Sequence, residues 1–329
     1  MVFSSQSSRL LELVSRSFAL CIPKLPSQVR GEAENFYLLC RFADSIEDSA
    51  LPARKKRIFF SRFGRTLKNN DLEAMDELCT QVLPHVVNDN DKELIVNFDE
   101  VFGVFQSFDK KSKRIALRWL YEMMKGMLKY SKKEIESFLD LDNYCYYVAG
   151  TVGLYMTEIC EHKFGLKKYI ELRARCRDFG LLLQKVNIIR DFAKDFSEGR
   201  VYWPNELFEK YGVEKNRALE EKDSEKKKLM LAEMIESTQA HIKNTIEYLE
   251  GLPVELRAVA AIPFCMAIPT LMKCNGNGDV FDASKKVKLS RAETMQIISE
   301  VERKAGKDSF AADFFTQITG KNPDKPEAL

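Results

Sequence analysis

The chain has 329 residues, of which 45% are hydrophobic and 30% are charged, a composition typical of a folded protein and too apolar for a disordered one. Its 51 lysines and arginines nearly balance 49 aspartates and glutamates, so the formal net charge of +2 gives no general attraction to nucleic acid. Nucleic acid is therefore excluded as an expected partner, and any charged site must be local.

Apolar residues recur at helical spacing along almost the whole sequence, and no convincing run of strands is found. A first helix, which contains Leu10 and Phe18, is expected to close at Pro23. A second ends near Asp48, before Leu51-Pro52. Residues 69–71 separate two more helices, and residues 199–204 interrupt a long helical stretch that follows Asp195. The sequence predicts an all-α protein.

The longest apolar stretch, residues 259–272, contains Pro263 and Pro269 and falls short of the roughly 18 residues of a membrane-spanning helix. The N-terminus carries Glu12 and Arg16 where a signal peptide would need apolar residues, so we expect a cytoplasmic protein.

The eight cysteines form no CxxC pair and have mostly apolar neighbours, which predicts buried free thiols.

A first acidic cluster, formed by Asp44, Glu47 and Asp48, ends a strongly apolar helix. Positions three and four apart share a helix face, so the three carboxylates would repel one another unless a cation compensates them. A solvent-exposed acidic helix end is the alternative interpretation of this cluster.

A second polar stripe lies on the helix expected over residues 181–195. Gln184, Asn187, Asp191 and Asp195 share one face, with Arg190 beside it, while the rest of the helix is apolar nearly all round. Since such a helix should be buried, its polar stripe must face a cavity, a partner or ions.

Five carboxylates on two such helices suit Mg²⁺, which prefers oxygen ligands and commonly bridges to substrate phosphates. Four arginines could neutralise the remaining phosphate oxygens, although each alone could be an ordinary surface ion pair: Arg16, Arg41, Arg190 and Arg200. The three histidines lack zinc-ligand spacing, and no glycine-rich phosphate-binding pattern occurs.

Several motifs together resemble the squalene/phytoene synthase family. They are Ser15-Arg16-Ser17-Phe18, the stretches 36–48 and 144–153, Gly180 to Asp191, and Gly199 to Pro204, and they follow the family order across roughly residues 9–300. The stretch 259–271 is similar to the squalene-forming branch.

The resemblance implies a single-domain, all-α class I isoprenoid synthase fold over residues 1–320, built around a central cavity, with a polar tail at 321–329. The implied reaction joins two farnesyl diphosphates through presqualene diphosphate to squalene, with Mg²⁺ assisting diphosphate departure and NADPH supplying hydride. Farnesyl diphosphate is then the small-molecule partner. A monomer that touches the membrane transiently, at its periphery, for product release is the further expectation.

The resemblance also implies site residues. Those expected to be catalytic are Tyr144, Asp44, Asp48, Asp191 and Asp195. Those expected to hold Mg²⁺ are Asp44, Glu47, Asp48, Asp191 and Asp195. Those expected to bind substrate are Ser15, Arg16, Ser17, Phe18, Tyr37, Arg41, Gln184, Asn187, Arg190 and Arg200. Those expected to contact NADPH are Arg16, Arg41, Arg190, Lys286 and Lys288.

Three positions depart from the family pattern. Lys288 stands where an arginine is usual, Val259 where squalene-forming members often have an aromatic ring, and Tyr146 in place of a histidine. Loss of a ring at Val259 removes one group that could face a cationic intermediate. Two alternatives stay open: dehydrosqualene or phytoene formation without NADPH, and a helical scaffold that kept the fold but lost catalysis.

Overall fold

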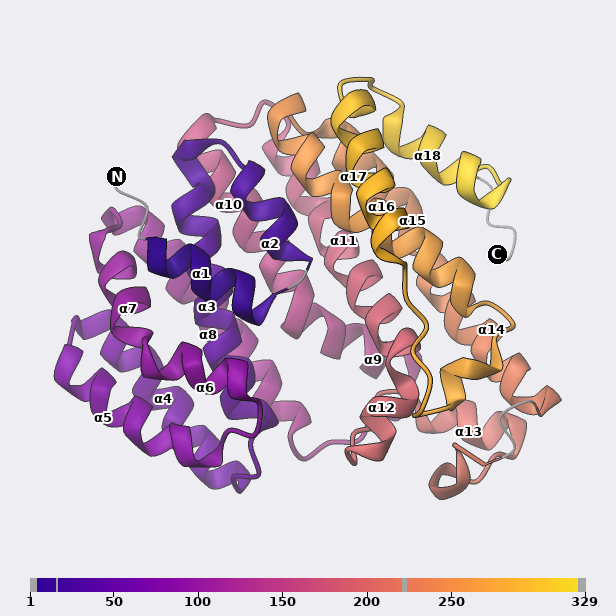
Figure 1. Ribbon diagram of the computed structural model, residues 1–329, viewed down its shortest axis with the longest axis horizontal. Helices are drawn as coiled ribbons and strands as arrows, with labels where there is room; N and C mark the ends of the chain where they lie inside the picture. Colours follow the sequence, from indigo (N-terminus) through magenta and orange to yellow (C-terminus); the bar gives the residue numbers. More distant parts are fainter. Residues whose placement is uncertain (1–4, 16, 221–223, 325–329) are drawn as a thin grey trace. The chain divides into compact units, whose positions relative to one another are not determined.

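The computed structural model describes residues 5–15, 17–220 and 224–324, and in these residues every regular element is helical. The predicted all-α class is confirmed. The chain divides into two compact units: residues 1–132 with 154–169, and residues 133–153 with 170–329. We call them unit 1 and unit 2, and their helices are labelled in Figure 1.

Unit 1 holds the N-terminal helices. They are α1 (Ser5–Val14), α2 (Phe18–Cys21), α3 (Ser27–Asp48), α4 (Ala53–Asn69), α5 (Leu72–Val82), α6 (Asp89–Val96), α7 (Phe98–Ser107) and α8 (Lys110–Tyr130). The prediction of one continuous first helix is wrong, because the helix ends at Val14 and a second helix, α2, begins at Phe18. The expected ends at Asp48 and at residues 69–71 are confirmed: Asn70 takes the left-handed conformation (φ 57°) and Asp71 caps α5.

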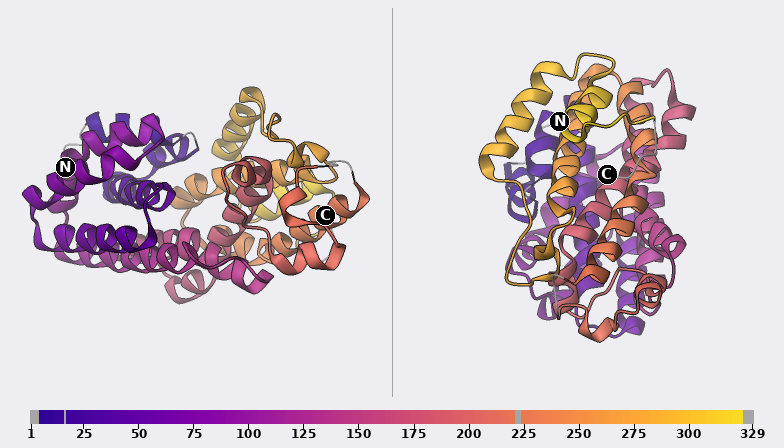
Figure 2. Two further views of the ribbon diagram at one scale, coloured as in Figure 1. Left: turned by 90° about the horizontal axis from the view of Figure 1, so that it is seen from below. Right: turned by 90° about the vertical axis from the view of Figure 1, so that its right-hand side faces the viewer.

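The core of unit 1 is aromatic. Phe42 of α3 lies between Phe63 of α4 and Phe98 of α7, with ring centroids 4.5 and 4.3 Å away, and all three side chains are buried. Burial of each such ring contributes about 1.5–3 kcal/mol. This cluster fixes α3, which carries the first acidic motif, against α4 and α7. The helices α1 to α8 of unit 1 are the indigo to magenta helices in Figure 2.

Two helices run across the division between the units: α10 (Thr151–Phe164) and α11 (Tyr169–Arg190). The remaining helices belong to unit 2. They are α9 (Phe138–Cys145), a π-helix at Tyr146–Gly150, α12 (Phe192–Ser197), α13 (Asn205–Tyr211), α14 (Glu225–Gln239), α15 (Ile242–Gly251), α16 (Val254–Cys274), α17 (Arg291–Lys304) and α18 (Phe310–Thr319). Short 3-10 turns cover 22–24, 83–85, 215–217 and 278–281.

Close helix packing in unit 2 depends on glycine. A Cβ added at Gly153 would lie 2.4 Å from the Cys176 carbonyl oxygen, and one at Gly180 would lie 2.5 Å from that of Ala149. Neither backbone can give way cheaply, so only glycine permits these distances. The two contacts hold α11 against the π-helix and the start of α10.

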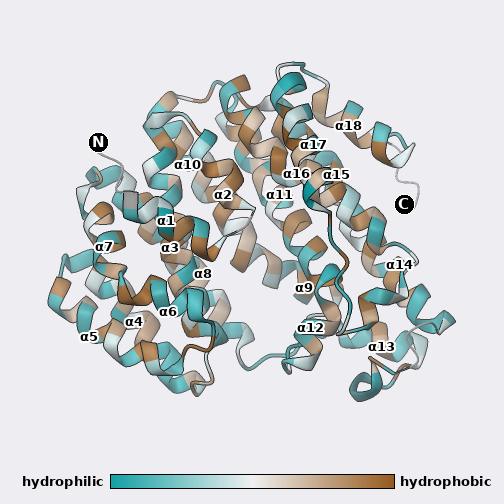
Figure 3. Ribbon diagram, in the orientation of Figure 1, coloured by the Kyte–Doolittle hydropathy of each residue, from teal (hydrophilic) through white to brown (hydrophobic). Residues whose placement is uncertain are grey.

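The expectation that the apolar stretch 259–272 is too short to span a membrane is wrong about its length, because the helix that contains it is longer. Helix α16 runs for 21 residues through Pro263 and Pro269, and within the described part of the chain it is the one helix long and apolar enough to cross a membrane. However, 61% of its most apolar window is buried, and it packs against α15, α17 and α18. Its composition is that of a core helix of unit 2, whereas most other helices interleave hydrophobic and hydrophilic residues (Figure 3).

The predicted burial of the cysteines is confirmed for seven of eight. All eight thiols are free, and Cys79 alone among them is half-buried.

Candidate active site

Unit 1 brings together five of the predicted residues along α3 and at the α1–α2 junction. Phe18 and Tyr37 lie with ring centroids 5.3 Å apart. The Ser15 hydroxyl accepts a hydrogen bond from the Phe18 backbone N–H at 3.0 Å and shares a side-chain hydrogen bond with Tyr37. Arg41 and Asp44 follow on the next turns of α3. Ser17 is exposed at the start of α2, and Arg16 lies outside the described residues.

Arg41 is held by a residue that the sequence did not single out. Its Nε and Nη2 donate to the two carboxylate oxygens of Asp91 on α6, both at 2.7 Å. Asp91 is buried, and its paired geometry is the strong form of an arginine–carboxylate contact. Asp91 stands in the polar run 88–91, which carries no motif, so only the tertiary contact identifies it.

The first acidic cluster is partly enclosed. Asp44 is half-buried, with Arg41 Nη1 3.8 Å from its Oδ2, whereas Asp48 is exposed at the helix end. Burial, opposed by Arg41 but reinforced by the negative charges of Asp48 and Asp91, raises the pKa of Asp44 to about 7. A raised carboxyl pKa means that the negative charge is poorly compensated by the protein alone.

Unit 2 holds the second acidic cluster at a helix break. Helix α11 ends at Arg190, Asp191 adopts a non-helical conformation (φ −98°, ψ 11°), and α12 begins at Phe192. The backbone hydrogen bonds Asp191 N–Asn187 O (2.8 Å) and Asp195 N–Asp191 O (2.9 Å) continue across the break. The predicted stripe therefore survives, although the expected single helix is divided in two.

Both aspartates of this cluster pair with an arginine. Arg190 forms a two-point contact with Asp191, and Arg200 Nη2 donates to Asp195 Oδ1 at 3.1 Å while also pairing with Glu198. Burial, together with the charge of Asp191, raises the pKa of Asp195 even though Arg200 opposes the rise. Gln184 and Asn187 are half-buried and make no side-chain hydrogen bond within the described residues.

Tyr144 is the second-last residue of α9, which ends at Cys145 directly before the π-helix, a rare distortion frequent at functional sites. Its ring is 5% exposed and stacks on Tyr202, with centroids 4.8 Å apart and planes 19° from parallel. The predicted NADPH residues Lys286 and Lys288 are exposed in the segment between Phe281 and Arg291.

The donor set suits Mg²⁺ rather than a metal that needs a protein cage. Among the described residues no three carboxylate, cysteine or histidine side chains converge into a ready cluster. Mg²⁺ commonly uses only one or two protein carboxylates and completes its shell with water and substrate phosphate. The raised pKa values of Asp44 and Asp195 fit this picture, because a nearby divalent cation would compensate their charge.

Comparison with known proteins agrees with the fold and these motifs. The family model described as squalene/phytoene synthase matches residues 11–293. A squalene synthase of Schizosaccharomyces pombe is 32% identical over 300 residues, with 88% of this chain and 63% of that protein covered. One of Solanum lycopersicum is 32% identical, with 97% and 76% covered. This chain thus spans less than two thirds of the Schizosaccharomyces pombe protein.

A solved complex of TcSQS with the ligand BPH1237 superimposes with a TM-score of 0.84 at 29% identity, over 95% of this chain and 89% of that one. The chain thus has the all-α isoprenoid synthase fold. The chain belongs to the squalene/phytoene synthase family, as its motifs predicted.

Proposed function

We propose that this chain is a prenyltransferase that joins two farnesyl diphosphates head to head into presqualene diphosphate and reduces that intermediate to squalene. Similarity to proteins named squalene synthase over most of the chain supports the choice within the family. The single observation that carries the mechanism is that aspartates of both acidic clusters lie beside arginines: Asp44 beside Arg41, Asp191 beside Arg190 and Asp195 beside Arg200.

The arginines and the carboxylates have different roles toward the diphosphate groups: the arginines bind the phosphate oxygens, and the carboxylates bind the metal. Guanidinium groups form paired hydrogen bonds with phosphate oxygens and stabilise the negative charge that develops as the C–O bond breaks. Asp44, Glu47, Asp48, Asp191 and Asp195 would hold Mg²⁺, which supplies further positive charge for the same departure. Gln184 and Asn187, as uncommitted amides, would orient the leaving group.

In the first half-reaction one C–O bond breaks and a C–C bond forms to the double bond of the second molecule. One proton is then lost, and the electron pair of its C–H bond forms a second C–C bond that closes a three-membered ring. Tyr144 is our candidate for the proton acceptor, with the released diphosphate as the final sink. Its stacking on Tyr202 fixes the plane of the ring. Aromatic rings such as Phe18 and Tyr37 keep water away and stabilise carbocations through their π faces.

In the second half-reaction the remaining C–O bond breaks, and the rearranged cation accepts hydride. NADPH supplies that hydride when bound. Lys286 and Lys288 are exposed, and neither forms an ion pair within the described residues, so both are open to nucleotide phosphates. Arg41 and Arg190 are already paired with aspartates and would have to share their hydrogen bonds. Arg16 is the fifth residue that we propose to contact NADPH.

We further propose a cytoplasmic monomer that touches the membrane transiently, because squalene is insoluble in water.

The test is product analysis by mass spectrometry after incubation with farnesyl diphosphate and Mg²⁺, with and without NADPH. Squalene formed only with NADPH supports the proposal. Dehydrosqualene or accumulated presqualene diphosphate in both reactions would replace it with the non-reducing alternative. Asp44→Asn and Asp191→Asn should each abolish product while the exposed Asp89→Asn does not; no turnover by the unsubstituted protein would favour a scaffold.

A further inference from the structure

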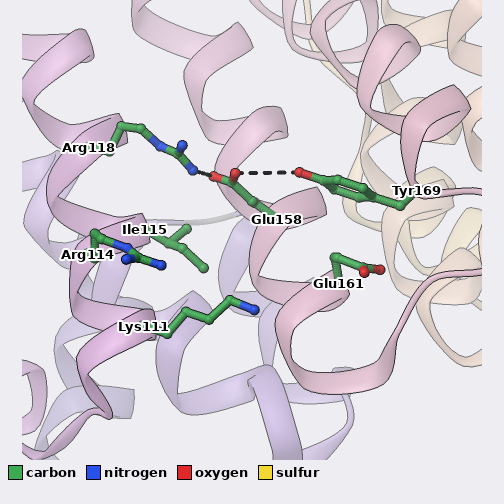
Figure 4. A pocket seen from close by; sticks show the side chains of 7 residues that line it. All are labelled: Lys111, Arg114, Ile115, Arg118, Glu158, Glu161 and Tyr169. Carbon is green, nitrogen blue, oxygen red and sulfur yellow. Dashed lines mark hydrogen bonds and ion pairs between the residues drawn. The ribbon is translucent and has the colours of Figure 1, made fainter.

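A pocket of about 290 Å³ lies within unit 1, lined by residues that the predicted catalytic, substrate and cofactor sets do not include (Figure 4). Helix α8 contributes Lys111, Arg114, Ile115 and Arg118, and α10 contributes Glu158 and Glu161, with Tyr169 beyond the following loop. The α8 residues are spaced i, i+3, i+4 and i+7, so they share one face. Three of them are cationic.

The two carboxylates of this pocket are already satisfied by the protein. Glu158 pairs with Arg118, accepts a hydrogen bond from Trp119 Nε1 at 2.6 Å, and lies 3.5 Å from the Tyr169 hydroxyl. Glu161 accepts a hydrogen bond from the Leu166 backbone N–H at 2.5 Å. Both carboxylates are therefore hydrogen-bonded to protein groups around the pocket.

Two cationic side chains of the pocket, in contrast, have no partner within the described part of the chain. The side chains of Lys111 and Arg114 form no hydrogen bond or ion pair within the part of the chain that the structure describes, and both extend from α8 toward the pocket. They also stand in the first turns of α8, where Asp109 is the cap and no acidic residue follows. A cation in the first turn of a helix, such as Lys111, opposes the helix dipole, which is unfavourable. An anion bound between Lys111 and Arg114 would compensate both positive charges.

We propose that this pocket binds a compact phosphate-type anion, held by Lys111 and Arg114. A volume of about 290 Å³ is at the small end of ligand pockets, which span roughly 300–1,000 Å³, and it accommodates a phosphate or diphosphate group. Arg114 can bind two oxygens in its plane, and Lys111 supplies a point charge. The inference does not depend on the proposed function.

The phosphate group could come from free diphosphate or from the headgroup of an anionic lipid. The loop between the end of α10 and Tyr169 carries the exposed Lys167 and Lys168, and Phe164, the last residue of α10, is also exposed. These residues would contact a membrane surface if the source were a lipid.

The experiment compares the full-length protein with Lys111→Gln/Arg114→Gln. The matched control is Arg65→Gln/Lys68→Gln on α4, which removes the same two charges from exposed positions of unit 1. Binding of inorganic diphosphate is measured by calorimetry without metal, and binding to phosphatidylcholine vesicles with and without phosphatidic acid is measured by sedimentation. A charge-retaining variant, Lys111→Arg/Arg114→Lys, tests for loss of fold and should keep binding.

We expect the pocket variant to lose about tenfold or more in affinity for one probe, with the control unchanged. Loss of diphosphate binding alone identifies a free anion as the ligand, and loss of phosphatidic acid-dependent sedimentation identifies a lipid headgroup. Equal binding by all variants would overturn the proposal. Equal loss in the pocket and control variants would overturn it too, since that result reflects net charge only.

Discussion

Lys185 Nζ lies 2.5 Å from Asp142 Oδ1 in the interior of unit 2. Lys185 is 1% exposed and also donates to the Ser237 carbonyl at 3.0 Å, so it joins α11 to α9 and α14. His241 extends the cluster: its Nε2 is 3.7 Å from Asp142 and its Nδ1 is 2.7 Å from Asp178. This polar cluster fixes α9, which carries Tyr144, against α11, which carries Gln184.

Replacement of Lys185 by methionine should destabilise the protein by about 1–3 kcal/mol, because it removes the ion pair of the half-buried Asp142 and leaves only His241 beside that carboxylate. Urea unfolding measures the change. Lys243→Met, on the exposed surface of α15, should alter stability by no more than about 0.5 kcal/mol. Equal effects of the two substitutions would show that the buried pair has no special role.

Asp91→Asn should reduce farnesyl diphosphate turnover by about tenfold, because Arg41 loses one oxygen of its two-point partner and its guanidinium is less well fixed. Steady-state kinetics on the purified variant provide the measurement. Asp89→Asn, on the same helix but 91% exposed at its side chain, is the control and should keep full activity. Unchanged kinetics of Asp91→Asn would show that the contact between Asp91 and Arg41 does not matter for substrate binding or turnover.

Gly153→Ala should destabilise unit 2 by about 1–3 kcal/mol or more, since the new methyl would overlap the Cys176 carbonyl. Gly103→Ala is the opposite case. That glycine is exposed within α7 and a Cβ there meets nothing within 4 Å, so alanine should stabilise by about 0.5–1 kcal/mol. Thermal melts of both variants should therefore shift in opposite directions.

Asp109 links stability to pH. Burial alone would raise its pKa, but hydrogen bonds from Lys163, the Ser112 N–H and hydroxyl, and His162 outweigh burial and hold the pKa well below its usual range. A lowered carboxyl pKa stabilises the fold above the unfolded-state pKa of about 3.9 and loses that contribution as pH falls toward the folded value.

The matching variant is Asp109→Ala, which removes the cap of α8 and should cost about 0.5–2 kcal/mol near neutral pH. The stability difference from the unsubstituted protein, followed by urea unfolding against pH, should shrink below about pH 4. A difference that stays constant down to pH 2 would contradict this assignment.

The sequence by itself determined the helical class, most breaks between helices and the two acidic motifs. Helical periodicity and residues such as Pro52, Asn70 and Gly199 act locally, through backbone dihedrals and capping, so they can be read without the tertiary structure. The same local signals failed at Ser15 and at Pro263 and Pro269. At α16, burial against three helices outweighs the cost of about 3 kcal/mol that a proline carries inside a helix.

Only the tertiary structure decided which charged side chains are compensated. Asp91 is 50 residues from Arg41, Asp142 is 43 residues before Lys185, and neither belongs to a motif. Their pairing depends on how separate helices pack, since the desolvation of a charge is set by its neighbours in space. The pocket beside Lys111 and Arg114 arises in the same way, because Glu158 and Glu161 lie on another helix and pair with other residues: Glu158 with Arg118 of α8, and Glu161 with the Leu166 backbone N–H.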